Sequence, residues 1–89
     1  MSEIDEILAA ALDLRERGEP AALATVVSVR GSSYRRPGAR LLVPVAGRPV
    51  GLISGGCLED EAARLARQAI EIDGPVLVTI DHAAEGDEL

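Results

Sequence analysis

A Ser-Gly-Gly-Cys run at residues 54–57 combines the residue types best suited to chemistry in this sequence. It separates an apolar stretch, 50–54, that predicts a strand from an amphipathic stretch, about 58–72, that predicts a helix. Glycines at the start of a helix bring backbone N–H groups close to a ligand. These donors and the helix dipole favour a bound anion. The same dipole favours the thiolate form of Cys57, close to the first helical position.

A purely structural interpretation of this run stays open at this point. Gly55 and Gly56 can form a tight turn, and Cys57 can be a small buried residue, since free cysteine is among the most buried residue types. Three acidic residues follow at 59–61, and their negative charge opposes both a bound anion and a thiolate. The spacing alone favours neither interpretation.

A second candidate segment is the loop 31–38, which joins small hydroxyl residues to adjacent arginines. Arginine offers a planar fork that suits phosphate or carboxylate, and loops hold binding residues more often than strands do. The alternative is a solvated surface hairpin. If the strands before the two segments are neighbours with suitable directions, both segments lie on one rim of the sheet. The candidate ligand-binding residues are Ser32, Arg35, Arg36 and Gly38 in this loop, and Ser54, Gly55, Gly56 and Cys57 in the glycine turn.

The charge distribution singles out the middle of the chain. The formal net charge of −6 argues against non-specific nucleic-acid binding, which needs a basic surface. Yet residues 20–58 hold five arginines and no acidic residue, while both flanks are acidic. His82 has no cysteine or histidine partner at metal-ligand spacing, and no Walker or Rossmann motif occurs.

The sequence pattern around these segments predicts an α/β domain with the element order α-β-β-β-α-β. Ser2 and Asp5 form a capping-box pattern at the start of the first helix. Pro44 places the second strand near an edge or a bulge. The last strand–helix–strand unit predicts a parallel pair with a right-handed crossover. The fold is a small mixed sheet of about four strands flanked by two helices. The helices are expected at 3–17 and 58–72, the strands at 22–30, 40–45, 50–54 and 76–80, and a flexible tail at 82–89.

Length and composition bound the remaining properties. The chain has 89 residues and neither Phe nor Trp, so it is one domain or part of one, with an aliphatic core. A thin core and an exposed sheet edge favour a homodimer. No apolar run is long enough to cross a bilayer, the first residues are acidic, and the single Cys57 excludes an internal disulfide. We therefore expect a cytoplasmic protein without membrane or nucleic-acid partners.

Three segments together resemble the N-terminal domain of the XdhC/CoxI family of accessory proteins, which mature molybdenum hydroxylases such as xanthine dehydrogenase and carbon monoxide dehydrogenase. The resemblance covers about 20–81, and it is specific because both motifs occur in this order and at this separation. Cys57 matches the motif cysteine, Gly55 and Gly56 its glycines, and Arg35 or Arg36, Pro37 and Gly38 its loop. The segments are Thr25-Val26-Val27, the run 31–40 and the run 51–59.

The resemblance implies a non-catalytic chaperone that binds the molybdenum cofactor, protects it during sulfuration and delivers it to an apo-hydroxylase. This cofactor is a pterin dithiolene with a phosphate, often extended to a dinucleotide. The backbone donors and arginines would hold the phosphate, and Cys57 would lie near the molybdenum. A cysteine desulfurase is a further expected partner.

Two other functions are compatible with the same residues. The chain could be a sulfur-transfer or redox enzyme with Cys57 as its nucleophile. It could instead be a structural module that docks to a partner enzyme and whose cysteine is buried. Family members usually continue into a second glycine-rich Cys-Gly-Gly segment, and many add a Rossmann domain. We therefore expect residues 1–89 to form a single XdhC/CoxI-like N-terminal domain that is truncated or a short form.

Overall fold

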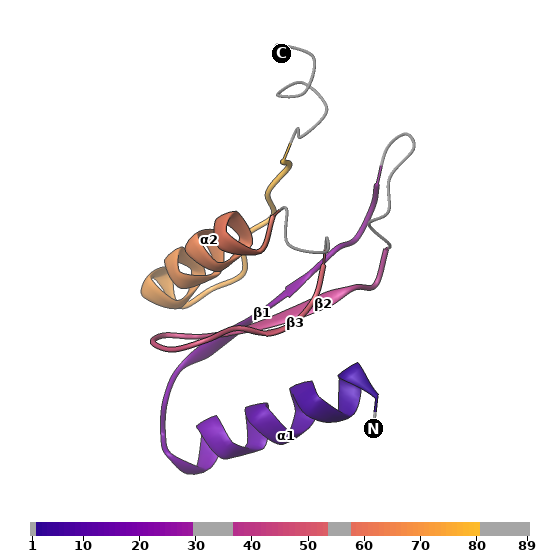
Figure 1. Cartoon of the computed structure of the whole chain (residues 1–89). Helices are drawn as coiled ribbons and strands as arrows, with labels where there is room; N and C mark the ends of the chain where they lie inside the picture. Colours follow the sequence, from indigo (N-terminus) through magenta and orange to yellow (C-terminus); the bar gives the residue numbers. More distant parts are fainter. Residues whose placement is uncertain (1, 30–36, 54–57, 81–89) are drawn as a thin grey trace.

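The computed structural model of the chain describes residues 2–29, 37–53 and 58–80. Within these ranges two helices flank a three-stranded sheet (Figure 1). The α/β class and the order of the first five elements are confirmed. None of the described helices is long and apolar enough to cross a membrane. The elements are α1 (Glu3–Glu16), β1 (Ala21–Thr25), β2 (Arg40–Pro44), β3 (Val50–Gly51) and α2 (Glu59–Ile72).

Helix α1 begins at the predicted capping box. The Ser2 hydroxyl accepts a hydrogen bond from the Asp5 N–H at 3.3 Å, and the Asp5 carboxylate accepts one from the Ser2 N–H at 3.2 Å. Two otherwise unsatisfied donors at the helix start are thereby paired. Only one side of the apolar face of α1 is buried, at Ile7 and Leu14. The large apolar residues on its other side, Ile4, Leu8 and Leu12, remain exposed.

The sheet is entirely antiparallel, with β2 at its centre and the order β1-β2-β3. The predicted antiparallel hairpin between the second and third strands is confirmed. Pro44 lies in the central strand rather than at an edge, but it is the last residue of β2. It is paired with Ala21 of β1 and lies beyond the residues that pair with β3. Its missing N–H therefore interrupts no ladder on that side.

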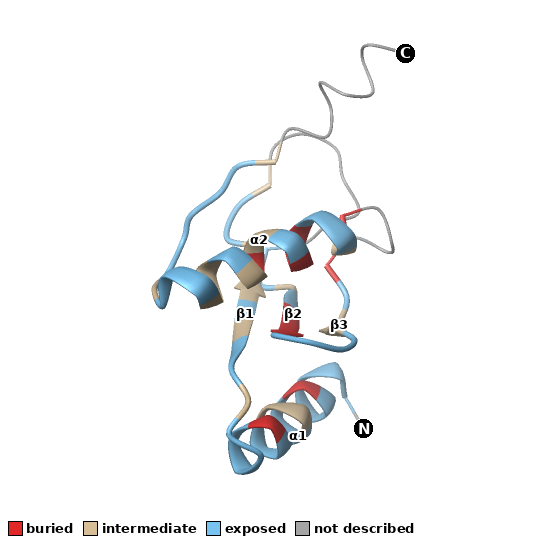
Figure 2. Cartoon of the chain, turned by 90° about the vertical axis from the view of Figure 1, so that its left-hand side faces the viewer, coloured by how far each residue is buried: buried red, intermediate tan, exposed pale blue. Residues whose placement is uncertain are grey.

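Each face of the sheet is covered by one helix (Figures 1 and 2). Leu41 and Val43 pack with α2, whereas Leu42, between them in the sequence, packs with α1. This alternation follows from the two-residue period of side chains along a strand. The helix α2 covers β1 and β2, and α1 covers β2 and β3. The buried residues are Leu41, Val43, Ile53, Ala62, Ala63 and Ala66 on one side, and Ile7, Leu14 and Leu42 on the other.

The prediction of a fourth strand at 76–80 was wrong, and with it the parallel strand–helix–strand unit. Among the described residues the sheet has three strands, and 75–80 is irregular. Val76, Leu77 and Val78 are exposed, Leu77 by 85%. An apolar β-branched run becomes a strand only when a neighbouring edge accepts its hydrogen bonds, and local sequence does not report that partner. The first and third strands also end earlier than predicted, at Thr25 and Gly51.

Arg67 joins α2 to the β2–β3 hairpin. Its Nε donates to the Pro44 carbonyl at 3.2 Å, and its Nη2 donates to the Gly47 carbonyl at 2.8 Å. One guanidinium thus donates to two carbonyl oxygens, one at the end of β2 and one in the connection to β3.

Replacing Arg67 by alanine should lower the free energy of unfolding by about 1–2 kcal/mol, because two hydrogen bonds from a charged donor are lost. Arg64→Ala is the matched control, since among the described residues Arg64 pairs only with Glu61, on the exposed surface, and little change is expected there. Urea unfolding of the three proteins measures both effects. Equal midpoints for the two variants would contradict the role given to Arg67.

Gly51 cannot carry a side chain without distortion. Its φ is +115°, and a Cβ atom there would lie 2.4 Å from the carbonyl oxygen of Arg40. Gly47 has a similar φ of +104°, but its nearest neighbour would be the Pro44 side chain at 3.9 Å.

We expect Gly51→Ala to destabilise the protein by more than about 2 kcal/mol, since backbone strain and a steric clash act together. Gly47→Ala adds backbone strain alone and should cost less. Thermal unfolding of both variants separates the two contributions. If both variants melt together, the close approach at Gly51 has no energetic consequence.

Candidate functional site

The ends of β1 and β3 lie at the same edge of the sheet. Thr25, the last residue of β1, pairs with Arg40, and Gly51, the last residue of β3, pairs with Leu41. Both strands run antiparallel to β2, so they run parallel to each other on either side of it. We call the edge marked by Thr25, Arg40 and Gly51 the loop rim.

Both candidate segments continue from strands that end at the loop rim. Residues 30–36 follow β1, and residues 54–57 follow β3. The sequence analysis made a common rim conditional on the two strands being neighbours. In the structure β2 lies between them, and both strands nevertheless end at the same edge. The described strands that lead into the two motif halves thus end at one edge of the sheet.

The two helices also begin at the loop rim (Figure 1). The Cδ1 atom of Ile7, in the first half of α1, lies 3.2 Å from the position that a Cβ atom would take at Gly51. At the start of α2, the Glu59 carboxylate accepts a hydrogen bond from the Ile53 N–H at 2.8 Å. The positive ends of two helix dipoles are therefore directed toward the same edge.

Of the eight predicted site residues, the structure describes Gly38. Its φ of +90° is a left-handed conformation that favours glycine. Its N–H donates to the Val26 carbonyl at 2.6 Å, and the Val26 N–H donates to the Ala39 carbonyl at 2.9 Å. These bonds join the segment after β1 to the segment before β2, on either side of the predicted arginine loop, 31–38. The other seven, Ser32, Arg35, Arg36, Ser54, Gly55, Gly56 and Cys57, lie outside the described residues.

Arg40 is a rim residue that the sequence interpretation did not single out. It is the first residue of β2 and is exposed, and its guanidinium has no hydrogen bond or ion pair with any residue in the described ranges. The acid-free stretch 20–58 was the available signal, but it did not separate Arg40 from the other arginines there.

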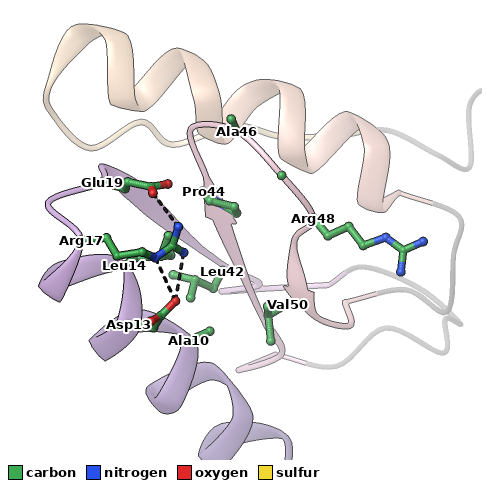
Figure 3. Close-up of a pocket in the computed structure, with 11 residues that line it drawn as sticks. Ala10, Asp13, Leu14, Arg17, Glu19, Leu42, Pro44, Ala46, Arg48 and Val50 are labelled. Carbon is green, nitrogen blue, oxygen red and sulfur yellow. Dashed lines mark hydrogen bonds and ion pairs between the residues drawn. The ribbon is translucent and has the colours of Figure 1, made fainter.

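Arg48 lies at the opposite end of the sheet, in the connection between β2 and β3 (Figure 3). A cavity of about 300 Å³ lies there between α1 and the hairpin. Arg17 within it is bound to Asp13 at 3.0 Å and to Glu19 at 2.6 Å, so its charge is compensated. Figure 3 shows the Arg48 side chain pointing away from these groups. The arginines of the acid-free stretch therefore do not form one patch, and this cavity is not the predicted site.

Two of the three acidic residues that follow the glycine turn are engaged within the protein. Glu59 accepts the Ile53 N–H. Glu61 accepts two hydrogen bonds from Arg64, at 2.9 and 2.8 Å, and these bonds, aided by the arginine's charge, lower the pKa of the Glu61 carboxyl. Asp60 is exposed. The Arg64 charge offsets that of Glu61, so the electrostatic opposition expected from this acidic run is reduced.

Within the described ranges, no group of three or more His, Cys, Asp or Glu side chains could hold a metal ion. Cys57 and His82, the single cysteine and the single histidine of the sequence, lie outside those ranges. Any contribution of Cys57 to binding a metal therefore stays a prediction.

Comparison of the sequence with known proteins assigns the chain to a family and finds two relatives. Residues 14–81 match the model of the XdhC and CoxI family. Over 48 residues, or 54% of this chain, the sequence is 52% identical to a probable xanthine dehydrogenase subunit of Bacillus subtilis (strain 168). Over 68 residues, or 76% of this chain, it is 40% identical to the molybdenum cofactor insertion chaperone PaoD of Escherichia coli (strain K12).

The matched regions make up 14% of the Bacillus protein and 20% of the Escherichia protein, so the chain spans a fifth or less of either relative. No solved structure gave a significant match. The family match nevertheless covers most of the chain, including both candidate segments and the strands that lead to them. The chain therefore belongs to the XdhC and CoxI family.

Proposed function

We propose that this chain is a cofactor-handling domain in the maturation of a molybdenum hydroxylase. It would bind the molybdenum cofactor as cargo and pass it to the apo-enzyme. The observation that supports this proposal is that β1 and β3, the strands that lead into the two family motifs, end at the same loop rim. The name of the Escherichia relative, a molybdenum cofactor insertion chaperone, supports the same role.

The chemistry of the rim suits the phosphate end of such a cargo. Arg40 is an exposed guanidinium without a partner among the described residues, and two helix N-termini are directed toward the same edge. Ser32, Arg35, Arg36 and Gly38 would contribute from one segment, and Ser54, Gly55 and Gly56 from the other. We propose that Cys57 lies near the molybdenum and its sulfur ligands, since thiolate is a soft ligand.

Partner and cargo can be specified further within this proposal. The name of the Bacillus relative points to a xanthine dehydrogenase as the recipient. The cargo would be held transiently, as molybdopterin or its dinucleotide, while a cysteine desulfurase supplies sulfur. A homodimer would cover the outer edge of β1, where Leu23 is exposed.

The proposal predicts that the chain purified from a cofactor-producing host carries molybdenum and pterin. Both would be measured per protein, molybdenum by mass spectrometry and pterin by fluorescence after oxidation. Cys57→Ser should lose molybdenum in preference to pterin, because the variant lacks the thiolate but keeps the phosphate-binding groups. A wild-type chain without pterin would refute the proposal for this chain, and undiminished molybdenum in Cys57→Ser would exclude Cys57 from the site. Turnover of a sulfur donor by the wild type would instead favour the enzymatic alternative.

Arg40→Gln should reduce the retained pterin by roughly tenfold, since a charge-assisted hydrogen bond to phosphate is lost. Arg48→Gln is the matched control, because it removes the same charge from the opposite end of the sheet. Pterin content of the two purified variants is compared with that of the wild type. An equal loss in both would indicate a general effect of net charge and would remove Arg40 from the site.

A further inference from the structure

The outer edge of β1 presents backbone groups whose direction is fixed by the hydrogen bonds on either side of the strand. Before β1, the Pro20 carbonyl accepts the Val45 N–H at 3.1 Å. After it, the Val26 N–H donates to the Ala39 carbonyl at 2.9 Å. Because backbone groups alternate in direction along a strand, the even-numbered residues of β1 point to β2 and the odd-numbered ones point outward. No described residue pairs with the outward groups, which belong to Ala21, Leu23 and Thr25.

The side chain of Leu23 lies on a part of the sheet that no described helix covers. Leu23 is directly opposite Leu42 of β2, which packs with α1, so both side chains point to the α1 face. That helix, however, contacts mainly β2 and β3, and Leu23 stays 52% exposed. The backbone edge and this side chain of β1 therefore both lack a partner in the described part of the chain.

The uncovered surface of β1 is bordered by apolar residues of α1. Ala10 and Asp13 face the β2–β3 hairpin, with which they line the cavity at the far end of the sheet. At 3.6 residues per turn, the exposed apolar residues of α1 lie on the other side of the buried residues Ile7 and Leu14, and hence toward β1. These exposed residues are Ile4, Leu8 and Leu12.

The distribution of charge favours a second copy of the chain as the occupant of this edge. The whole chain carries a net charge of −6, so most surfaces of two copies repel each other. Residues 21–29 contain no charged residue and no proline. Two copies can therefore meet at this strand without placing like charges opposite each other, and each supplies the open edge that the other needs.

We propose that two copies of the chain pair antiparallel through β1, with Leu23 on the two-fold axis. In this register Leu23 lies opposite Leu23 of the second copy, and Ala21 lies opposite Thr25. Each of these pairs joins residues whose backbone groups point outward, so each exchanges two N–H···O hydrogen bonds. The three strands of each copy become one sheet of six, and the two Leu23 side chains lie side by side between the two α1 helices.

This inference gives a geometry to the homodimer of the proposed function. It rests on that assembly and not on the cargo, because none of the residues that form the interface belongs to either candidate segment. Its tests therefore need no cofactor.

The first test follows amide hydrogen exchange of the whole chain by NMR, at concentrations where sedimentation shows monomer and dimer. The Leu23 and Thr25 amides should exchange at least about tenfold more slowly in the dimer, because they are hydrogen-bonded only there. The Ala22 and Ala24 amides point to β2 and should be protected in both states. Absence of a dimer, or a dimer in which Leu23 and Thr25 exchange as in the monomer, would overturn the proposal. Their protection in the monomer would assign the edge to another segment of the same chain, such as 75–80, and would overturn it too.

The second test places a charge on the two-fold axis. Leu23→Lys should raise the dissociation constant of the dimer by at least about tenfold, because two like charges then lie directly opposite each other. Leu52→Lys is the matched control: Leu52 is 53% exposed and directly follows β3, on the other side of β2. It should leave the dissociation constant unchanged, and equal weakening by both variants would contradict the proposed interface.

A mixing experiment tests the register itself. Leu23→Glu should be monomeric like Leu23→Lys, whereas an equimolar mixture of the two should dimerise again, since opposite charges then face each other across the axis. A mixture of folded variants that stays monomeric would refute pairing about residue 23. If either variant does not fold, the exchange measurement on the wild type decides. A wild type that dimerises in this way but carries no pterin would refute cofactor binding alone, and one that binds pterin as a monomer would refute the β1 pairing alone.

Discussion

Strand β2 places three consecutive apolar residues, Leu41, Leu42 and Val43, in the middle of a very short chain. Alternation along the strand sends them to opposite faces, and all three are buried. The sheet therefore needs cover on both sides, which α1 and α2 supply, and the strand needs a neighbour on both edges, which β1 and β3 supply. The positions of the other elements follow from this two-sided burial.

The shared loop rim is a consequence of the same central strand. Any two strands that are each antiparallel to a third must run parallel to each other, so β1 and β3 end at one edge however long the chain between them is. Segments far apart in the sequence can therefore follow strands that end at the same edge. Arg40 lies there because it opens β2, and Arg48 lies at the far end because it follows the reversal of the chain.

Features that depend on neighbouring residues could be predicted from the sequence. The capping box of α1, both helices and the antiparallel hairpin are encoded within a few positions, and the structure contains them. The prediction of a fourth strand was wrong because an apolar run such as 76–80 contains no local signal for the sheet edge that it would join. Arg40 was missed for a related reason, since its place beside Thr25 is set by pairing between strands. The roles of Arg35, Arg36 and the turn 54–57 stay predictions, because those residues lie outside the described ranges.

The outer edge of β1 has a practical consequence for work with this chain. Among the described residues β1 pairs only with β2, Leu23 is 52% exposed, and residues 21–29 contain no charge and no proline. Natural edge strands usually carry charged residues or proline, which obstruct pairing with strands of other molecules. At high protein concentration, pairing between the exposed edges of different molecules therefore competes with refolding. Dilute refolding or low-temperature expression should give the higher yield of soluble material.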